Sequence, residues 1–123
     1  MVGRFFMKGM VEMEIKIGTT PNLTVRFRGL DRNVAVKSAE FVFKQECSQD
    51  APELVRKSWP GEVTRKKGGV YSVPFSEAET RLFEAGKYMY MDTRIHFAGG
   101  GIVAAPVAAL MVRPTLFGEE EQE

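Results

Sequence analysis

The residues best suited to chemistry in this chain are its one histidine, His96, and its one cysteine, Cys47. Such a pair can act as nucleophile and base when the side chains are within hydrogen-bond reach. Cys47, however, stands in a polar segment with no oxyanion-type glycine motif beside it. One histidine and one cysteine also cannot supply the four ligands of a structural zinc site. We therefore expect an incidental thiol and a strand histidine, no catalytic residue, no metal and no cofactor.

Asp92 is a further candidate acid or base, because a carboxylate can take or give a proton. It falls within a strand pattern, and Arg94 or Arg113 could pair with it. We interpret Asp92 as one half of a structural ion pair. The Gly99-Gly100-Gly101 run has no helix after it to present amides to a phosphate, so it predicts a flexible hairpin.

Basic residues gather around the single tryptophan, Trp59, if the strands expected near Leu54 and Glu62 pair with each other. The basic residues are Arg56, Lys57, Arg65, Lys66 and Lys67. Basic and aromatic side chains together can bind single-stranded nucleic acid, but charges on short edge strands also prevent aggregation. The net charge of only +1 favours the second interpretation, so nucleic acid is an unlikely partner.

The position of Trp59 in the sequence supports two interpretations equally. Before Pro60-Gly61 it could anchor a protein contact, or it could plug one end of the fold. On the first reading, the candidate partner-contact residues are Trp59, Arg65, Lys66 and Lys67.

The composition is that of one soluble globular domain. The chain has 123 residues, 44% of them hydrophobic and 27% charged. One cysteine excludes an internal disulfide. The most apolar stretch, Ile102 to Val112, is broken by Pro106 and is too short to span a membrane, so we expect no membrane partner. The N-terminal segment lacks the features of an export signal.

The stretch from Val70 to Ile95 has the clearest secondary-structure pattern in the chain. Tyr71, Val73 and Phe75 share one parity, as a strand with one buried face requires. Ser76 and Glu79 then have the spacing of a helix capping box. We expect a short helical turn that ends at Gly86, followed by a strand in which Tyr88 locks the corner through its hydroxyl, as in immunoglobulin-like sandwiches.

Alternation and turn residues predict the other strands. The expected strands are Val11–Ile17, Leu23–Phe27, Val34–Lys37, Ala39–Gln45, Leu54–Ser58, Glu62–Arg65, Ile102–Ala105 and Val107–Arg113. With the strands around the helical turn, they predict an all-β fold, an immunoglobulin-like antiparallel β-sandwich of about seven to eight strands with one short helical turn.

The strand that begins at Tyr88 has a conflicting pattern. Tyr88 and Tyr90 share one parity, whereas methionines and later apolar residues share the other. We expect Tyr88 and Tyr90 to point inward first, and Ile95 and Phe97 after a bulge near Met91 and Asp92. That arrangement keeps Asp92 and Arg94 out of the core.

We divide the chain into three parts. Residues 1–12 are interpreted as a non-native or disordered extension, because a purine-rich codon stretch for Lys8-Gly9 resembles a ribosome-binding site before a start at Met13 or Met10. Residues 13–117 form the β-sandwich domain. The acidic tail, residues 118–123, is expected to be disordered.

Four short motifs resemble a group of small phage and prophage proteins. The motifs are GTTPNLTVRF (Gly18 to Phe27), AEFVFKQ (Ala39 to Gln45), VPFSEAET (Val73 to Thr80) and GKYMYMDTRI (Gly86 to Ile95). Similar proteins are encoded among the tail and baseplate genes of phages that infect Gram-positive bacteria. This chain differs from their pattern by one extra residue before Arg94-Ile95, which also suggests the bulge.

The resemblance implies a non-enzymatic immunoglobulin-like structural or assembly component. Its partners would be other phage structural proteins, and a small protein of this kind is also compatible with a homo-oligomer. Its location would be the virion, or the host cytoplasm during assembly. The alternative is a carbohydrate- or ligand-binding β-sandwich module, for which Trp59, Tyr71, Tyr88 and Tyr90 supply the only aromatic platform.

Overall fold

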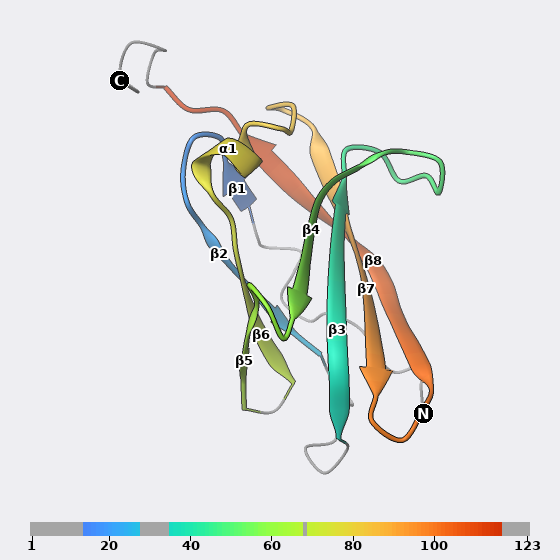
Figure 1. Ribbon diagram of the computed structural model, residues 1–123. Helices are drawn as coiled ribbons and strands as arrows, with labels where there is room; N and C mark the ends of the chain where they lie inside the picture. The colour runs from blue at the N-terminus through green and yellow to red at the C-terminus, as the bar shows by residue number, and fades with distance from the viewer. Residues whose placement is uncertain (1–13, 28–34, 68, 117–123) are drawn as a thin grey trace.

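The computed structural model describes residues 14–27, 35–67 and 69–116, which form eight strands and one short helix (Figure 1). The strands are β1 (Glu14–Lys16), β2 (Asn22–Arg26), β3 (Val36–Lys44), β4 (Glu53–Trp59), β5 (Thr64–Lys66), β6 (Val70–Pro74), β7 (Tyr88–Phe97) and β8 (Ile102–Arg113). The helix is α1 (Glu77–Thr80), in the connection from β6 to β7. The expected all-β fold is confirmed.

The strands form two facing sheets. The larger sheet has five strands in the order β1-β8-β7-β3-β4, and the smaller has three in the order β2-β6-β5. Every pairing is antiparallel except that of β1 with β8, which is parallel. The central strands β3, β7 and β8 of one sheet, against β2, β6 and β5 of the other, give the immunoglobulin-like arrangement of a sandwich. Alternating side chains from both sheets fill the space between them.

The core contains the residues that alternation placed inward. Phe41 and Phe43 of β3 are fully buried, as are Tyr71 and Val73 of β6, and Phe75 just after β6 is 3% exposed. Phe43 and Phe75 meet edge to face across the two sheets, with ring centroids 4.9 Å apart. The two expected pieces around Ala39 are one continuous strand, β3.

The orientation predicted for the start of β7 is wrong. Met89 and Met91 are fully buried, whereas Tyr88 is 50% exposed and does not lock a corner in the core. The inward parity continues unbroken through Thr93 and Ile95. Burying methionine rather than tyrosine on β7 adds no further phenolic hydroxyl to the core, and the same parity keeps the charged residues of β7 outside.

The bulge lies in β8 rather than in β7. Met91 is opposite Ala108 and Thr93 is opposite Ala105, so Pro106 and Val107 together face the single residue Asp92. Proline has no N–H to donate to the ladder and is tolerated at such irregularities. The extra residue reverses the parity of β8, because Val103 and Ala105 are buried before it and Leu110 and Val112 after it.

The connection from β6 to β7 begins as predicted. Ser76 N donates to Glu79 Oε1 at 2.8 Å and Glu79 N donates to Ser76 Oγ at 3.1 Å, so the capping box is confirmed. The helix ends earlier than expected, with Arg81 as its C-cap. Gly86 follows with a φ of 85° and donates its N–H to Val112 O at 2.8 Å, which fixes the crossover to the larger sheet.

Some predictions fall outside the described residues. They concern the extension at residues 1–12, the start at Met10 or Met13, the part of the first strand before Glu14, and the tail at residues 118–123. Within the described ranges, no helix is long and apolar enough to cross a membrane.

A nearly buried ion pair joins the edge strand β4 to the helix. Lys57 is 8% exposed, and its Nζ lies 2.9 Å from Glu79 Oε1. Burial raises the pKa of Glu79, but the hydrogen bonds from Lys57 and Ser76 outweigh it and lower that pKa below its ordinary value. The same carboxylate therefore closes the capping box and neutralises an inward-facing lysine, which ties the larger sheet to the crossover.

Replacing Glu79 by glutamine separates these two roles, because glutamine also completes a capping box. We expect Glu79→Gln to lower the free energy of unfolding by about 1–2 kcal/mol near neutral pH, since Lys57 loses its partner. A carboxylate with a lowered folded pKa stabilises the fold above its ordinary pKa, and this contribution disappears as the pH falls through the folded pKa. The difference from wild type should therefore shrink in acid, as measured by urea unfolding.

Glu77→Gln is the matched control, because Glu77 pairs with Arg81 at 2.7 Å on the exposed side of the same helix. Its effect should stay below about 0.5 kcal/mol. An equal loss in both variants, or a Glu79→Gln loss that does not change with pH, would contradict the assignment.

Candidate protein interface

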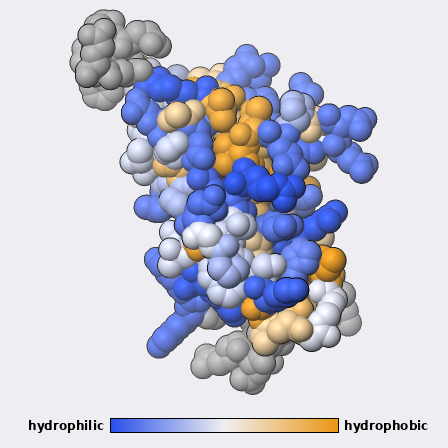
Figure 2. All heavy atoms as spheres, in the orientation of Figure 1, coloured by the Kyte–Doolittle hydropathy of each residue, from blue (hydrophilic) through white to orange (hydrophobic). Residues whose placement is uncertain are grey.

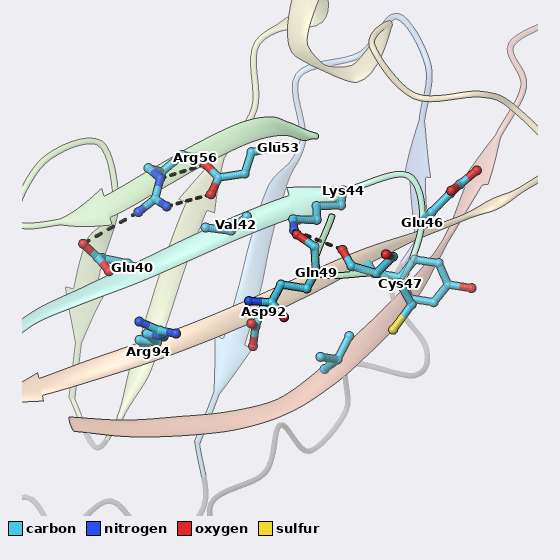
Figure 3. Close-up of a pocket in the computed structure, with 13 residues that line it drawn as sticks. Glu40, Val42, Lys44, Glu46, Cys47, Gln49, Glu53, Arg56, Asp92 and Arg94 are labelled. Carbon is cyan, nitrogen blue, oxygen red and sulfur yellow. Dashed lines mark hydrogen bonds and ion pairs between the residues drawn. The ribbon is translucent and has the colours of Figure 1, made fainter. Parts of the chain in front are cut away.

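The outer face of the larger sheet carries a groove of about 520 Å³ (Figure 3). Strand β7, the middle strand of this sheet, supplies one side and β4 the other. Val42 of β3 lies between them, and the loop after β3 closes one end. The lining residues are Glu40, Val42, Lys44, Glu46, Cys47, Ser48, Gln49, Glu53, Arg56, Tyr90, Asp92, Arg94 and Val107. The groove therefore combines both charges with aromatic and aliphatic groups.

The β4 side of the groove is held by one arginine between two carboxylates. Arg56 donates to both oxygens of Glu53, at 3.0 and 2.8 Å, and lies 3.7 Å from Glu40 (Figure 3). The hydrogen bond with Arg56 lowers the pKa of Glu53 and raises that of Arg56. Glu40 also lies 3.5 Å from His96 Nε2. The side chains of Arg56, Glu53 and Glu40 are 40–49% exposed, so they shape the surface more than they stabilise the fold.

The loop that closes the groove is fixed by side chains from its own start. Lys44 Nζ donates to the carbonyls of Ser48 and Gln49, each at 3.1 Å. Gln45 Nε2 donates to Tyr88 O at 2.9 Å, and its Oε1 accepts from Glu84 N at 2.7 Å. The polar segment around Cys47 is a loop, and the bonds of Gln45 anchor it to the connection between β6 and β7.

The β7 side of the groove carries two opposite charges without ion partners in the described part of the chain. Asp92 Oδ1 accepts only from the neighbouring Thr93 N, at 3.0 Å, and Arg94 makes no ion pair there. The predicted pairing of Asp92 with Arg94 or Arg113 is wrong. Arg113 pairs with Glu14 of β1 instead, at 3.2 Å. Both Asp92 and Arg94 are exposed, at the centre of the outer face.

Apolar side chains cover the neighbouring part of this face. Tyr88 of β7 is 50% exposed, and Ile102 and Val107 of β8 are 60% and 49% exposed. Exposed alanines lie between them on β8. Large apolar groups beside unpaired charges are typical of a surface that contacts another protein. Figure 2 shows a separate apolar area between the positions of β4 and α1. Leu82, which follows α1 in the chain, is 52% exposed.

The structure divides the basic cluster predicted from the sequence. The strands near Leu54 and Glu62 do not pair, because β4 pairs with β3 in the larger sheet and β5 with β6 in the smaller. Lys57 points inward and Arg56 lines the groove, whereas Lys66 and Lys67 are exposed on or beside β5. Each short strand finds its partner in a different sheet, which no local pattern reveals.

Of the four predicted contact residues, the structure brings two together. The Arg65 guanidinium lies 5.1 Å from the Trp59 ring centre and 5.9 Å from that of Tyr71. Trp59 and Tyr71 meet edge to face at 6.2 Å. Trp59 is half-buried and packs against the core, as the plug interpretation requires, and Arg65 covers it by a cation–π contact.

The nucleophile pair considered for Cys47 and His96 is not assembled. Cys47 is exposed in the loop after Lys44, which pairs with Tyr90, while His96 is at the other end of β7. At about 3.3 Å per residue, about 20 Å of strand separates the two ends. In the described ranges, no three His, Cys, Asp or Glu side chains are grouped to hold a metal ion.

Neither a scan against models of protein families nor a search of curated proteins finds a match to this chain.

Sequence reasoning missed the outer-face residues Asp92 and Arg94 as a candidate contact pair, because it assigned them a structural partner. The available signal was the methionine parity of β7. The parity of Met89, Met91 and Ile95 has three apolar residues that need no hydrogen bond, whereas the other parity has two tyrosines. If the first set is buried, Asp92 and Arg94 both lie on the solvent face.

Tyr71 provides a test of the packing beneath Trp59. Its side chain is fully buried, and its hydroxyl has no hydrogen-bond partner among the described residues. Burial raises its pKa. Because a buried polar group without a partner is costly, we expect Tyr71→Phe to raise the free energy of unfolding by about 1 kcal/mol. Tyr90→Phe, on the outer face, should change it by less than about 0.5 kcal/mol. Destabilisation by Tyr71→Phe in urea unfolding would refute this account of the core.

Proposed function

We propose that the protein is a non-enzymatic structural or assembly component that acts through protein–protein contacts. The observation that carries this proposal is the outer face of the larger sheet, which exposes Tyr88, Ile102 and Val107. The same face carries Asp92 and Arg94, which have no ion partner among the described residues. Aromatic and apolar groups supply area to an interface, and charged groups supply specificity.

The rigidity of this face also supports a contact role. Strand β7 is the middle strand and is paired on both sides, and Gln45 and Lys44 fix the loop at the end of the groove. A face that is already ordered loses little conformational entropy when a partner binds. A rigid strand face is therefore better suited to a repeated structural contact than a mobile loop.

The motifs that resemble phage tail and baseplate proteins suggest a setting for this contact. On this proposal the partners are other phage structural proteins, and the protein is located in the virion or in the host cytoplasm during assembly. Sequencing of the genes that flank this one tests the setting, because portal, tape-measure or baseplate genes are expected beside it. Metabolic genes on both sides would count against a virion role.

The outer face can then be tested with the purified products of those flanking genes. We expect Asp92→Ala with Tyr88→Ala to weaken capture of a partner at least about tenfold, because both a charge and a large apolar contact are removed. Biolayer interferometry measures the dissociation constant. Thr24→Ala with Arg26→Ala, on the exposed side of β2 in the smaller sheet, is the matched control. Equal weakening by both pairs would contradict the assignment of the surface.

A carbohydrate- or ligand-binding module remains the second candidate, and the groove with Tyr90 beside carboxylates and arginines favours it. Of the aromatic platform expected from the sequence, Tyr71 is buried and Trp59 is covered, so Tyr90 alone lines the groove. A sugar ligand should be detected on a glycan array and lost in Tyr90→Ala, with Tyr88→Ala as the control outside the groove lining. An array without any bound glycan would end this candidate.

A further inference from the structure

We infer that the partner for the outer face of the larger sheet is a second copy of this chain, docked face to face about a two-fold axis that crosses β7 at Thr93. This inference rests on the proposed contact function and assigns the outer face to a second copy instead of a product of a flanking gene. In such an isologous interface, residue i contacts residue j while j contacts i. The face must therefore be complementary to itself, and the register of the larger sheet makes it so.

The first complementary feature is a pair of opposite charges on β7 that have no ion partner among the described residues. Asp92 and Arg94 lie on either side of Thr93 on the same face of the middle strand. An axis in the plane of the interface, perpendicular to β7 at Thr93, makes the two copies of β7 antiparallel. It places Asp92 of each copy opposite Arg94 of the other. Each charge that lacks an ion partner in the described part of one copy thereby gains one, and two equivalent ion pairs form at the centre of the interface.

The second complementary feature is the apolar row on β8. Ile102 is in register with His96, and Ala109 is in register with Tyr90. Tyr90 and His96 are equally far from Thr93 along β7, so the same axis exchanges their positions. Ile102 of one copy therefore faces Ala109 and Tyr90 of the other. The isoleucine is thereby covered by an aliphatic and an aromatic side chain. Dimerisation buries apolar surface that is exposed to water in the monomer, which is favourable.

The third feature lies on the other side of β7. Glu40 of β3 is in register with Arg94, whereas Arg56 of β4 is in register with Val42 and through it with Asp92. The two-fold axis exchanges the position of Arg94 along the strands with that of Asp92, so Glu40 of one copy comes toward Arg56 of the other. Because Glu40 and Arg56 are already 3.7 Å apart within one copy, each carboxylate would then have an arginine from both copies nearby. Glu40 then faces Val42 of the other copy, which has Arg56 on one side and Asp92 on the other, so the guanidinium offsets the nearby carboxylate. No two like charges face each other directly.

Charge-swap variants test this geometry. Asp92→Arg gives a chain with two positive charges at the centre, and Arg94→Asp gives one with two negative charges, so each should repel its own copy. We expect each variant alone to raise the dimer dissociation constant at least about a hundredfold, measured by sedimentation velocity. An equimolar mixture should form a heterodimer with close to wild-type affinity, since every pair is again opposite in charge. Native mass spectrometry identifies the heterodimer by its mass.

The control is Arg26→Asp, which makes the same charge reversal on exposed β2 of the smaller sheet and should leave the dimer unchanged. If either swap variant fails to fold, Asp92→Asn and Arg94→Gln remove the attraction without repulsion and should still weaken the dimer at least about tenfold. A wild-type chain that stays monomeric at high concentration, or a mixture that forms no heterodimer, overturns the inference. A monomer that still captures a flanking gene product through Asp92 would overturn the second copy alone and leave the proposed function intact.

Discussion

The middle strand of the larger sheet can bury only one of its two faces, and the rest of the molecule is arranged around that choice. Strand β7 places Met89, Met91, Thr93 and Ile95 between the sheets without interruption. Its neighbours β3 and β8 pair with it along nearly its whole length. Since the side-chain period of a strand is two, fixing the inward set also fixes the outward set. The outward set carries the charges and tyrosines of the candidate interface.

The bulge in β8 and the anchored loop after β3 lie in the two segments that pair with β7 or follow its neighbour. Strand β8 cannot keep its apolar residues inward along its whole length with a single parity, so it gains one residue at Pro106 and Val107 and changes face there. The change leaves Val107 on the outer face beside Asp92. At the other end, Gln45 connects the loop after β3 to Tyr88 and Glu84, so the groove is part of the same framework as the core. The burial of one face of β7 thus determines both the packing of the core and the composition of the candidate interface.

The sequence predicted what depends on local patterns. The strands with clear alternation, such as β2 and β6, and the capping box of Ser76 with Glu79 follow from neighbouring residues alone. The orientation of β7 was not predicted correctly, because tyrosine and methionine are both apolar enough to be buried. The difference between them is the tyrosine hydroxyl, which needs a hydrogen bond when it is buried. The pairing of β4 and β5 with different sheets, and the burial of Lys57 against Glu79, depend on contacts between distant segments. A lysine on a short edge strand is more often solvated, which is why its inward position escaped prediction.

The outer face of the larger sheet is the surface through which, on our proposal, this chain docks on a second copy of itself. The most direct measurement is solution NMR of methyl-labelled protein at increasing concentration, with Ile102 and Val107 as reporters of that face and Val25 and Val73 as reporters of the core of the smaller sheet. We expect concentration-dependent chemical-shift changes at Ile102 and Val107, while the shifts of Val25 and Val73 stay constant. Shifts confined to the smaller sheet, or no shift at Ile102 and Val107 at any concentration, would contradict it.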